Sequence, residues 1–248
     1  MVKILDSIHQ AKAEGKKLLA LLIDPDSMGN ADQVMDVVNK AESASIDYIL
    51  FGGSLITKTE KLDSLKMIKQ ITNIPVILFP SNPAQIRTEA DAILFLSLLS
   101  GRNPEFLIGH HVTAAPLLRN TNLEILPTGY LLVGCGIPTT AEYVSGTPPI
   151  PYHKPGIAAA TAMAGEMLGM RLIYLDGGSG ADKAVSVEMI SEVRKSVDLP
   201  LIVGGGIRSG EAGSAAFEAG ADMIVVGNGV EKNPDLIQEL SLSKDRSK

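Results

Sequence analysis

The sequence predicts an α/β fold in which eight parallel strands close into a (β/α)8 barrel. Eight short apolar runs alternate with longer amphipathic segments along the 248 residues. Within the runs, polar and apolar residues do not alternate, which is typical of strands buried on both faces of a parallel sheet. Eight is the number of strands that closes such a barrel, and about 250 residues is its usual length. Because no low-complexity linker divides the chain, residues 1–248 are expected to form a single domain.

The predicted strands follow the apolar runs in order: 18–24, 48–53, 75–80, 92–96, a run within 124–133 interrupted by Pro127, 171–176, 201–204 and 223–227. Between them, apolar residues recur at helical spacing over four segments: 31–43, 61–71, 185–197 and 211–219. The alternation of strand and helix indicates parallel pairing. An open, doubly wound sheet would show the same alternation and is the main alternative.

Three segments break the regular pattern. The link 81–91 is short for a crossover helix, so the helix after the third strand is expected to be weak or replaced. The segment 134–156 is rich in Pro, Gly and Thr, which predicts a long functional or mobile loop. The polar end, 241–248, is expected to be a frayed tail.

Composition excludes several classes of function. The net charge of −6 and the lack of a basic run argue against nucleic acid as a partner. Cys135 is the only cysteine, so a disulfide framework is excluded. The sequence contains no run of about 18 apolar residues, the length needed to cross a bilayer. Residues 1–10 also lack the apolar core of a signal peptide. We therefore expect a cytoplasmic protein with at most peripheral membrane contact.

Polar and glycine-rich residues follow the predicted strands, at the barrel end where active sites lie. Glycine clusters follow the last three strands, at 177–180, 204–206 and 227–229. Glycines let backbone N–H groups approach a ligand closely, and barrels often bind phosphate after strands seven and eight. Three clusters at successive strand ends predict a phosphate site, whereas any one of them alone is compatible with an ordinary turn.

Asp24 ends the first strand and is a candidate Mg²⁺ ligand, with Ser54 able to add an oxygen. Mg²⁺ takes one or two carboxylates together with substrate phosphate oxygens. For Asp26 we favour the simpler interpretation that it caps the following helix. The sequence contains no paired Cys/His spacing of a zinc site.

Tyr174 and Asp176 are two residues apart on the sixth strand, so their side chains point the same way. Asp176 is a candidate general base or acceptor for a substrate hydroxyl. The alternative is that Tyr174 is a core residue and Asp176 a turn former. His153 is a candidate anion contact in the long loop, and Cys135 is interpreted as a small buried residue.

These motifs resemble the geranylgeranylglyceryl phosphate synthase family, which includes the bacterial heptaprenylglyceryl phosphate synthases. The matching segments are 22–26, 51–54, 77–80, 174–180, 203–208 and 225–228. The resemblance implies a modified barrel whose third helix is replaced. It also implies an ether-lipid prenyltransferase that joins a polyprenyl diphosphate, with geranylgeranyl diphosphate expected, to the 3-hydroxyl of sn-glycerol 1-phosphate and releases diphosphate.

The resemblance also implies roles for individual residues. Asp24 and Ser54 would bind Mg²⁺, and Tyr174 and Asp176 would be catalytic. Glycerol phosphate would be held by Tyr174, Leu175, Asp176, Gly177, Gly178, Ser179, Gly180, Gly205, Gly206, Gly227 and Asn228. The prenyl groove has candidates in Leu98, Leu99, Phe106, Leu107 and Ile108.

The chain departs from the family at Asp176, where the family often has Glu. Since a carbon–carbon bond is about 1.5 Å, the carboxylate is retracted by roughly that length. The ending of this motif resembles the second of the family's two branches, which implies a homo-oligomer, either a dimer or a hexamer. Two other functions stay open: an isomerase or lyase of the phosphosugar barrels, and a non-catalytic phosphate-binding barrel.

Overall fold

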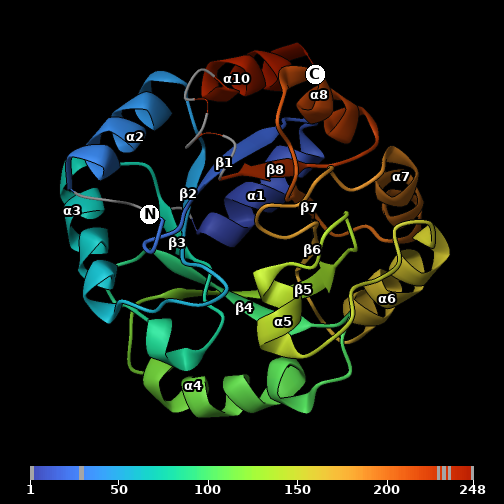
Figure 1. Ribbon diagram of the computed structural model, residues 1–248, viewed down its shortest axis with the longest axis horizontal. Helices are drawn as coiled ribbons and strands as arrows, with labels where there is room; N and C mark the ends of the chain where they lie inside the picture. Colours follow the sequence, from blue (N-terminus) through green and yellow to red (C-terminus); the bar gives the residue numbers. More distant parts are fainter. Residues whose placement is uncertain (1–2, 28–30, 228–229, 231–232, 234–235, 247–248) are drawn as a thin grey trace.

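The computed structural model describes residues 3–27, 31–227, 230, 233 and 236–246. Its eight strands are all parallel and close into a barrel in sequence order, with β1 paired to β8 (Figure 1). This closure excludes the open doubly wound sheet. The strands are β1 (Leu18–Ile23), β2 (Tyr48–Phe51), β3 (Val76–Leu78), β4 (Ala92–Leu98), β5 (Glu124–Leu132), β6 (Leu172–Asp176), β7 (Leu201–Gly204) and β8 (Met223–Val226).

Helices surround the strands as an outer ring, while α1 is seen within the ring (Figure 1). Their bounds are α1 (Ile4–Ala13), α2 (Ala31–Ser43), α3 (Ser64–Ile71), α4 (His110–Leu118), α5 (Thr140–Ser145), α6 (Pro155–Met167), α7 (Val187–Ser196), α8 (Gly210–Glu218) and α10 (Leu236–Arg246). Shorter turns are η1 (Thr59–Asp63), η2 (Pro83–Gln85) and η3 (Glu105–Gly109). Across the described residues, no helix has the length and apolar character needed to cross a bilayer.

The amino end of the barrel is closed by α1. Ile4, Ile8 and Ala11 are buried in the same apolar cluster as the inward-facing strand residues. The first two N–H groups of the helix have no partner within a helix. The Glu124 carboxylate, at the start of β5, accepts hydrogen bonds from the Ile4 and Leu5 N–H groups at 2.7 and 3.0 Å. The open end of the barrel is therefore the carboxyl end.

Alternation along the strands divides the core into two layers. On β6, Leu172 and Tyr174 belong to the cluster inside the barrel, whereas Ile173 and Leu175 belong to the cluster between strands and helices. The period of two is that of any β-strand. It confirms that Tyr174 and Asp176 point to the same side, toward the barrel interior.

The connection between β3 and β4 contains only η2, a three-residue turn, among its elements. The expectation of a weak or replaced helix after the third strand is confirmed. Pro83 starts the turn, and Asn82 accepts a hydrogen bond from the Ala84 N–H at 2.9 Å. The segment 134–156, expected to be a long loop, holds the short helix α5 and a bridge between Val133 and Ile150.

The expectation of a frayed tail over 241–248 is wrong for the part that the structure describes, because α10 continues to Arg246. Its polar residues make tertiary contacts. The Ser243 hydroxyl donates to the Gly210 carbonyl oxygen at 2.8 Å, and the buried Lys244 ammonium pairs with Asp47 at 3.0 Å. A long lysine can bury its stem and still keep its charge paired, so a polar composition did not indicate exposure here.

Three strands are preceded by an aspartate with the same two contacts at the amino end of the barrel. Each carboxylate accepts a hydrogen bond from a backbone N–H near the start of the preceding strand, and each pairs with a basic side chain. The sets are Asp47 with Leu19 N–H and Lys244, Asp91 with Val76 N–H and Lys69, and Asp222 with Leu201 N–H and Arg194.

Replacing Asp222 with alanine is expected to lower the free energy of unfolding by about 3 kcal/mol. The substitution leaves the buried Leu201 N–H without its acceptor and removes the anionic partner of the partly buried Arg194 guanidinium, which keeps its hydrogen bond to the Val197 carbonyl oxygen. Equilibrium urea unfolding measures the change. Asp36 is the control: its pair with Lys40 is solvent-exposed, so Asp36→Ala should cost less than about 0.5 kcal/mol. Equal effects of the two substitutions would contradict a special role for Asp222.

Candidate active site

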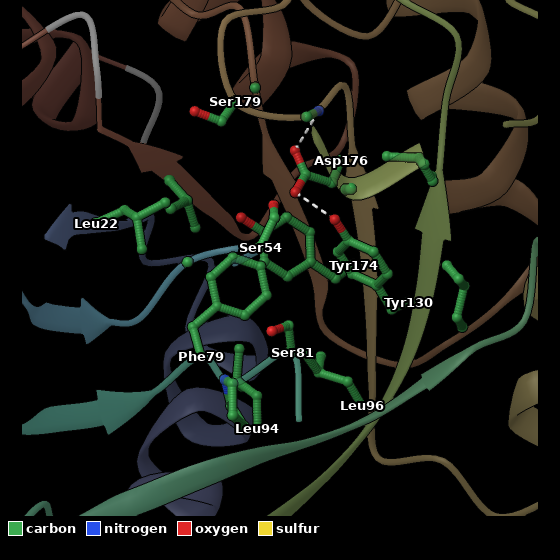
Figure 2. Close-up of a pocket in the computed structure, with 18 of the residues that line it drawn as sticks. Leu22, Ser54, Phe79, Ser81, Leu94, Leu96, Tyr130, Tyr174, Asp176 and Ser179 are labelled. Atoms are coloured by element: carbon green, nitrogen blue, oxygen red, sulfur yellow. Dashed lines mark hydrogen bonds between the residues drawn. The ribbon is translucent and has the colours of Figure 1, made fainter. Parts of the chain in front are cut away.

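A single cavity occupies the carboxyl end of the barrel and receives residues from most of the strand ends (Figure 2). Most of the residues predicted from the strand ends line it. They are Asp24, Ser54, Tyr174, Asp176, Gly178, Ser179, Gly180, Gly205, Gly206 and Gly227. The fold therefore brings together residues that lie as far apart in the sequence as Asp24 and Gly227.

Two predicted binding residues do not line the cavity, and a third lies outside the described residues. Leu175 points outward into the layer between strands and helices and is fully buried there. Gly177 packs against Cys135, since a Cβ at Gly177 would lie 3.1 Å from the Cys135 sulfur. Asn228 lies outside the described residues.

Asp24 faces the cavity across the backbone of the neighbouring strand end. A Cβ on Gly53 would lie 2.7 Å from the Asp24 Oδ2 atom, so only glycine leaves room for the carboxylate in this position. The Oδ1 atom accepts a hydrogen bond from the Asp26 N–H at 2.9 Å. Ser54 lines the same part of the cavity.

The residues around Asp24 fit a magnesium ion whose remaining ligands come from a bound substrate and water. Among the described residues there is no group of three His, Cys, Asp or Glu side chains that could hold a metal alone. Mg²⁺ does not require one, because it usually binds through one or two carboxylates plus substrate phosphate oxygens and water. One carboxylate and one hydroxyl at the rim of an open cavity match that donor set.

Asp26 makes different contacts from Asp24. Its Oδ2 atom accepts hydrogen bonds from the Thr57 N–H and from the Thr57 hydroxyl, both at 2.7 Å. Burial alone would raise the pKa of Asp26, but the hydrogen bonds from Thr57 outweigh it and the pKa is lowered. Asp26 thus ties the loop after β1 to the loop after β2.

Asp176 lies at the centre of a buried polar cluster (Figure 2). Its Oδ2 atom accepts a hydrogen bond from the Tyr130 hydroxyl at 2.6 Å, and its Oδ1 atom accepts one from the Gly178 N–H at 2.7 Å. Burial raises the pKa of the Asp176 carboxyl, although both hydrogen bonds act to lower it. Burial also raises the pKa values of Tyr130 and Tyr174 well above the usual range, so both phenols are neutral.

Three aromatic rings form one wall of the cavity beside this cluster. Phe79, from the end of β3, stacks on Tyr174 with ring centroids 5.4 Å apart. Tyr130 meets both rings edge to face, at 5.5 Å from Tyr174 and 6.0 Å from Phe79. Electron-rich ring faces can stabilise a nearby positive charge.

The loops after β6 and β7 meet at the opposite side of the cavity. Gly205 and Gly206 have φ angles of 79° and 72°, which only glycine adopts without strain. A Cβ on Gly205 would lie 2.7 Å from the Gly178 backbone nitrogen, so the two loops touch through their backbones. The Arg208 guanidinium donates to the Ala181 carbonyl oxygen at 2.5 Å and holds the loops together. Backbone N–H groups gathered in this way make a concave site for an anion.

An apolar arm extends the cavity sideways between η2 and α4, where the barrel has only a turn in place of a helix. Apolar residues predominate in this part of the cavity lining, beside His110. Pro83, Ile86, Ile93, Phe95 and Ala114 lie on the helix side of β4, whereas Leu94, Leu96, Leu98 and Phe106 belong to the apolar cluster inside the barrel. Of the predicted groove residues, Leu98 and Phe106 line it, whereas Leu99, Leu107 and Ile108 do not. His111 also lines the arm, and burial lowers the pKa of its imidazole.

Sequence reasoning missed the residues that lie inside strands or in short turns. Tyr130 sits within the apolar run of β5, and no local pattern marks it. Phe79 precedes Pro80 in a run that reads as an ordinary strand end. His153, a candidate anion contact, is exposed and does not line the cavity. Cys135 is buried as expected, and burial raises the pKa of its thiol to about 12.

Comparison of the sequence with known proteins finds relatives over nearly its whole length. The PcrB family model matches residues 12–243. A geranylgeranylglyceryl phosphate synthase of Spirosoma linguale is 54% identical over 94% of both chains, and one of Chitinophaga pinensis is 48% identical over 96% of this chain and 94% of the relative.

A solved structure agrees with the sequence comparison. The (S)-3-O-geranylgeranylglyceryl phosphate synthase of Thermoplasma acidophilum, in complex with its substrate sn-glycerol-1-phosphate, superposes with a TM-score of 0.93. The two chains are 33% identical, and the match covers 99% of this chain and 100% of the other. The family model and the relatives span nearly the whole chain. The chain therefore belongs to the PcrB family, as a relative of the geranylgeranylglyceryl phosphate synthases.

Proposed function

We propose that this protein joins a polyprenyl diphosphate to the 3-hydroxyl of sn-glycerol 1-phosphate and releases diphosphate. The observation that carries the proposal is the shape and chemistry of one cavity, which is polar and glycine-rich at β6–β8 and apolar beside η2 and α4. Such a cavity suits two substrates, a small phosphate and a long hydrocarbon. The relatives named geranylgeranylglyceryl phosphate synthase support it, and so does the glycerol phosphate complex of the Thermoplasma enzyme.

Glycerol phosphate would bind against the loops after β6, β7 and β8. The N–H groups near Ser179, Gly180, Gly205, Gly206 and Gly227 would hold its phosphate, because backbone donors at loop ends bind anions. Anchoring the phosphate fixes the distance of the 3-hydroxyl from the reacting carbon, and such positioning accounts for a large part of many rate enhancements. Asp176 would orient that hydroxyl and take up its proton.

The prenyl tail would lie in the apolar arm, with the diphosphate near Asp24 and Ser54. Those two residues would hold Mg²⁺, which, when bound, would neutralise charge on the leaving diphosphate. As the bond to the leaving group lengthens, the allylic carbon gains cationic character. Tyr174 and Phe79 line the cavity beside Asp176, and their ring electrons, together with the Asp176 carboxylate, would stabilise positive charge on that carbon. A geranylgeranyl chain is the expected donor, from the names of the relatives.

We also propose that the protein works as a homo-oligomer, a dimer or a hexamer. The outer side of α6 is unusually apolar: Ile157, Met163 and Met167 are exposed, and Leu168 follows the helix at 71% exposure. Contiguous apolar patches on a protein surface mark interaction sites. Light scattering coupled to size exclusion measures the mass, and a monomer would contradict the proposal.

The cytoplasmic location stays a prediction.

Turnover tests the proposed function. The purified protein is incubated with radiolabelled sn-glycerol 1-phosphate, Mg²⁺ and prenyl diphosphates of several lengths, and label extracted into organic solvent is counted. Label that appears only with both substrates and the metal supports the prenyltransferase, and the best chain length identifies the donor. Binding of glycerol phosphate without turnover at any length would favour the non-catalytic barrel. Isomerisation of a phosphosugar would favour the isomerase.

A further inference from the structure

Tyr130 lies beside the Asp176 carboxylate in the cavity. Its ring lines the cavity from β5, and in the register of the barrel it lies directly beside Tyr174 of β6. Its hydroxyl donates to the Asp176 Oδ2 atom at 2.6 Å, a distance typical of a strong hydrogen bond to a carboxylate (Figure 2). The edge-to-face contacts with Phe79 and Tyr174 hold the ring in place.

Both oxygens of Asp176 are already engaged by the protein. Oδ1 accepts from the Gly178 N–H, and Oδ2 accepts from Tyr130. The aspartate side chain has only one methylene, so the carboxylate stays close to β6, and it is just 7% exposed. The phenolic oxygen of Tyr130 donates one hydrogen and keeps its acceptor lone pairs. A hydroxyl in the cavity can therefore donate to Tyr130 while Tyr130 donates to Asp176.

We propose that Tyr130 is a catalytic residue that relays the proton of the attacking hydroxyl to Asp176. The proposal rests on the proposed function. Tyr130 extends the reach of the short aspartate by one hydrogen bond of 2.6 Å. Because the phenol stays neutral before and after the transfer, the relay needs no tyrosinate in the resting protein.

The 3-oxygen of glycerol phosphate forms a bond to the first carbon of the prenyl group, and the bond from that carbon to the diphosphate oxygen breaks, with its electron pair leaving on diphosphate. The hydroxyl proton moves to the Tyr130 oxygen, and the Tyr130 proton moves to Asp176 Oδ2. Asp176 returns the proton to water when the products leave.

Three variants test the relay: Tyr130→Phe, Asp176→Glu and the double variant. Tyr130→Phe is expected to lower kcat about a hundredfold, the lower end of what proton transfer contributes. The KM for sn-glycerol 1-phosphate should stay within about threefold, because the phosphate contacts are untouched. In the double variant the longer glutamate reaches the substrate directly, so kcat should recover at least about tenfold over Tyr130→Phe.

Tyr48→Phe is the matched control. Tyr48 is also buried inside the barrel, and its hydroxyl shares a hydrogen bond of 2.6 Å with Ser7 at the closed end. Removing the Tyr48 hydroxyl should lower the stability of the protein by about as much as Tyr130→Phe does. It should leave kcat within twofold of the wild-type value, which corresponds to about 0.4 kcal/mol in activation free energy. Thermal unfolding and calorimetric binding of sn-glycerol 1-phosphate confirm that each variant is folded.

The outcomes separate the relay from the function on which it rests. An active wild type with a Tyr130→Phe variant that keeps its kcat overturns the relay alone. A double variant no more active than Tyr130→Phe overturns the relay as well. In that case the distance between the short aspartate and the substrate hydroxyl would not explain the low kcat of Tyr130→Phe. A wild type that forms no product with any prenyl diphosphate overturns the proposed function and the relay together.

Discussion

Replacing Asp24 with alanine is expected to lower kcat at least about a thousandfold while the barrel stays folded. A bound metal is worth several kcal/mol to a reaction that releases charge, and about 4 kcal/mol corresponds to a factor of a thousand. Asp24 is the carboxylate that the cavity offers near Ser54, and Gly53 leaves the room that it needs. The measurement is turnover as a function of Mg²⁺ concentration in wild type and variant.

Asp26→Asn is the control for Asp24→Ala, since it alters the other carboxylate of the same loop. Asp26 binds Thr57 and does not line the cavity, so this variant should lose stability and keep kcat within about fivefold, or 1 kcal/mol. Calorimetric titration with sn-glycerol 1-phosphate should show unchanged affinity in both variants. Full activity of Asp24→Ala, or wild-type turnover that persists in excess chelator, would remove the metal assignment.

Asp176→Asn is expected to lower kcat by about two to four orders of magnitude, the range of a lost general base. Asparagine keeps the shape of aspartate and an acceptor for the Gly178 N–H, but it cannot take up the hydroxyl proton. Asp198→Asn is the control, because Asp198 lies on the surface and pairs with Lys12 far from the cavity. Unchanged kinetics of Asp176→Asn would reduce Asp176 to a turn residue.

The pH dependence of kcat gives a second measurement on Asp176. A base must be ionised to act, so the rate rises as Asp176 loses its proton with increasing pH. Burial raises the pKa of Asp176, and the groups that face it are Tyr130, Tyr174 and Cys135. The acid limb of the profile should therefore lie above the usual range of an aspartate. In Tyr130→Phe a hydrogen bond that lowers this pKa is lost, so the residual activity should show its acid limb at still higher pH.

Much of the fold could be predicted because parallel barrel strands leave a clear signature in the sequence. Their burial on both faces produces continuous apolar runs, and all eight predicted runs overlap a strand of the barrel. Helix α6 was harder to recognise, since its run of Ala and Gly is apolar on every side and shows no helical face. The end of the chain was misjudged because the contact of Lys244 with Asp47 joins residues far apart in sequence.

The candidate site was predictable where residues follow strands and unpredictable where they lie within them. The carboxyl ends of parallel strands meet at one end of a barrel, so Asp24, Asp176 and the glycine clusters could be assigned to one cavity. Tyr130 became recognisable only through the register of β5 and β6, which places it beside Tyr174. A single sequence carries no information on which residues of adjacent strands are neighbours.

The three aspartates at the amino end of the barrel have a consequence for how this protein can change. Asp222 precedes β8 and Gly227 follows it, a span of five residues, or about 16 Å at 3.3 Å per residue. Substitutions farther apart than about 10 Å usually have additive effects on stability. The half of the barrel that anchors the strands and the half that binds ligands can therefore be altered separately. A substitution that stabilises the closed end could therefore offset the stability lost when a substitution at the open end changes the substrate specificity.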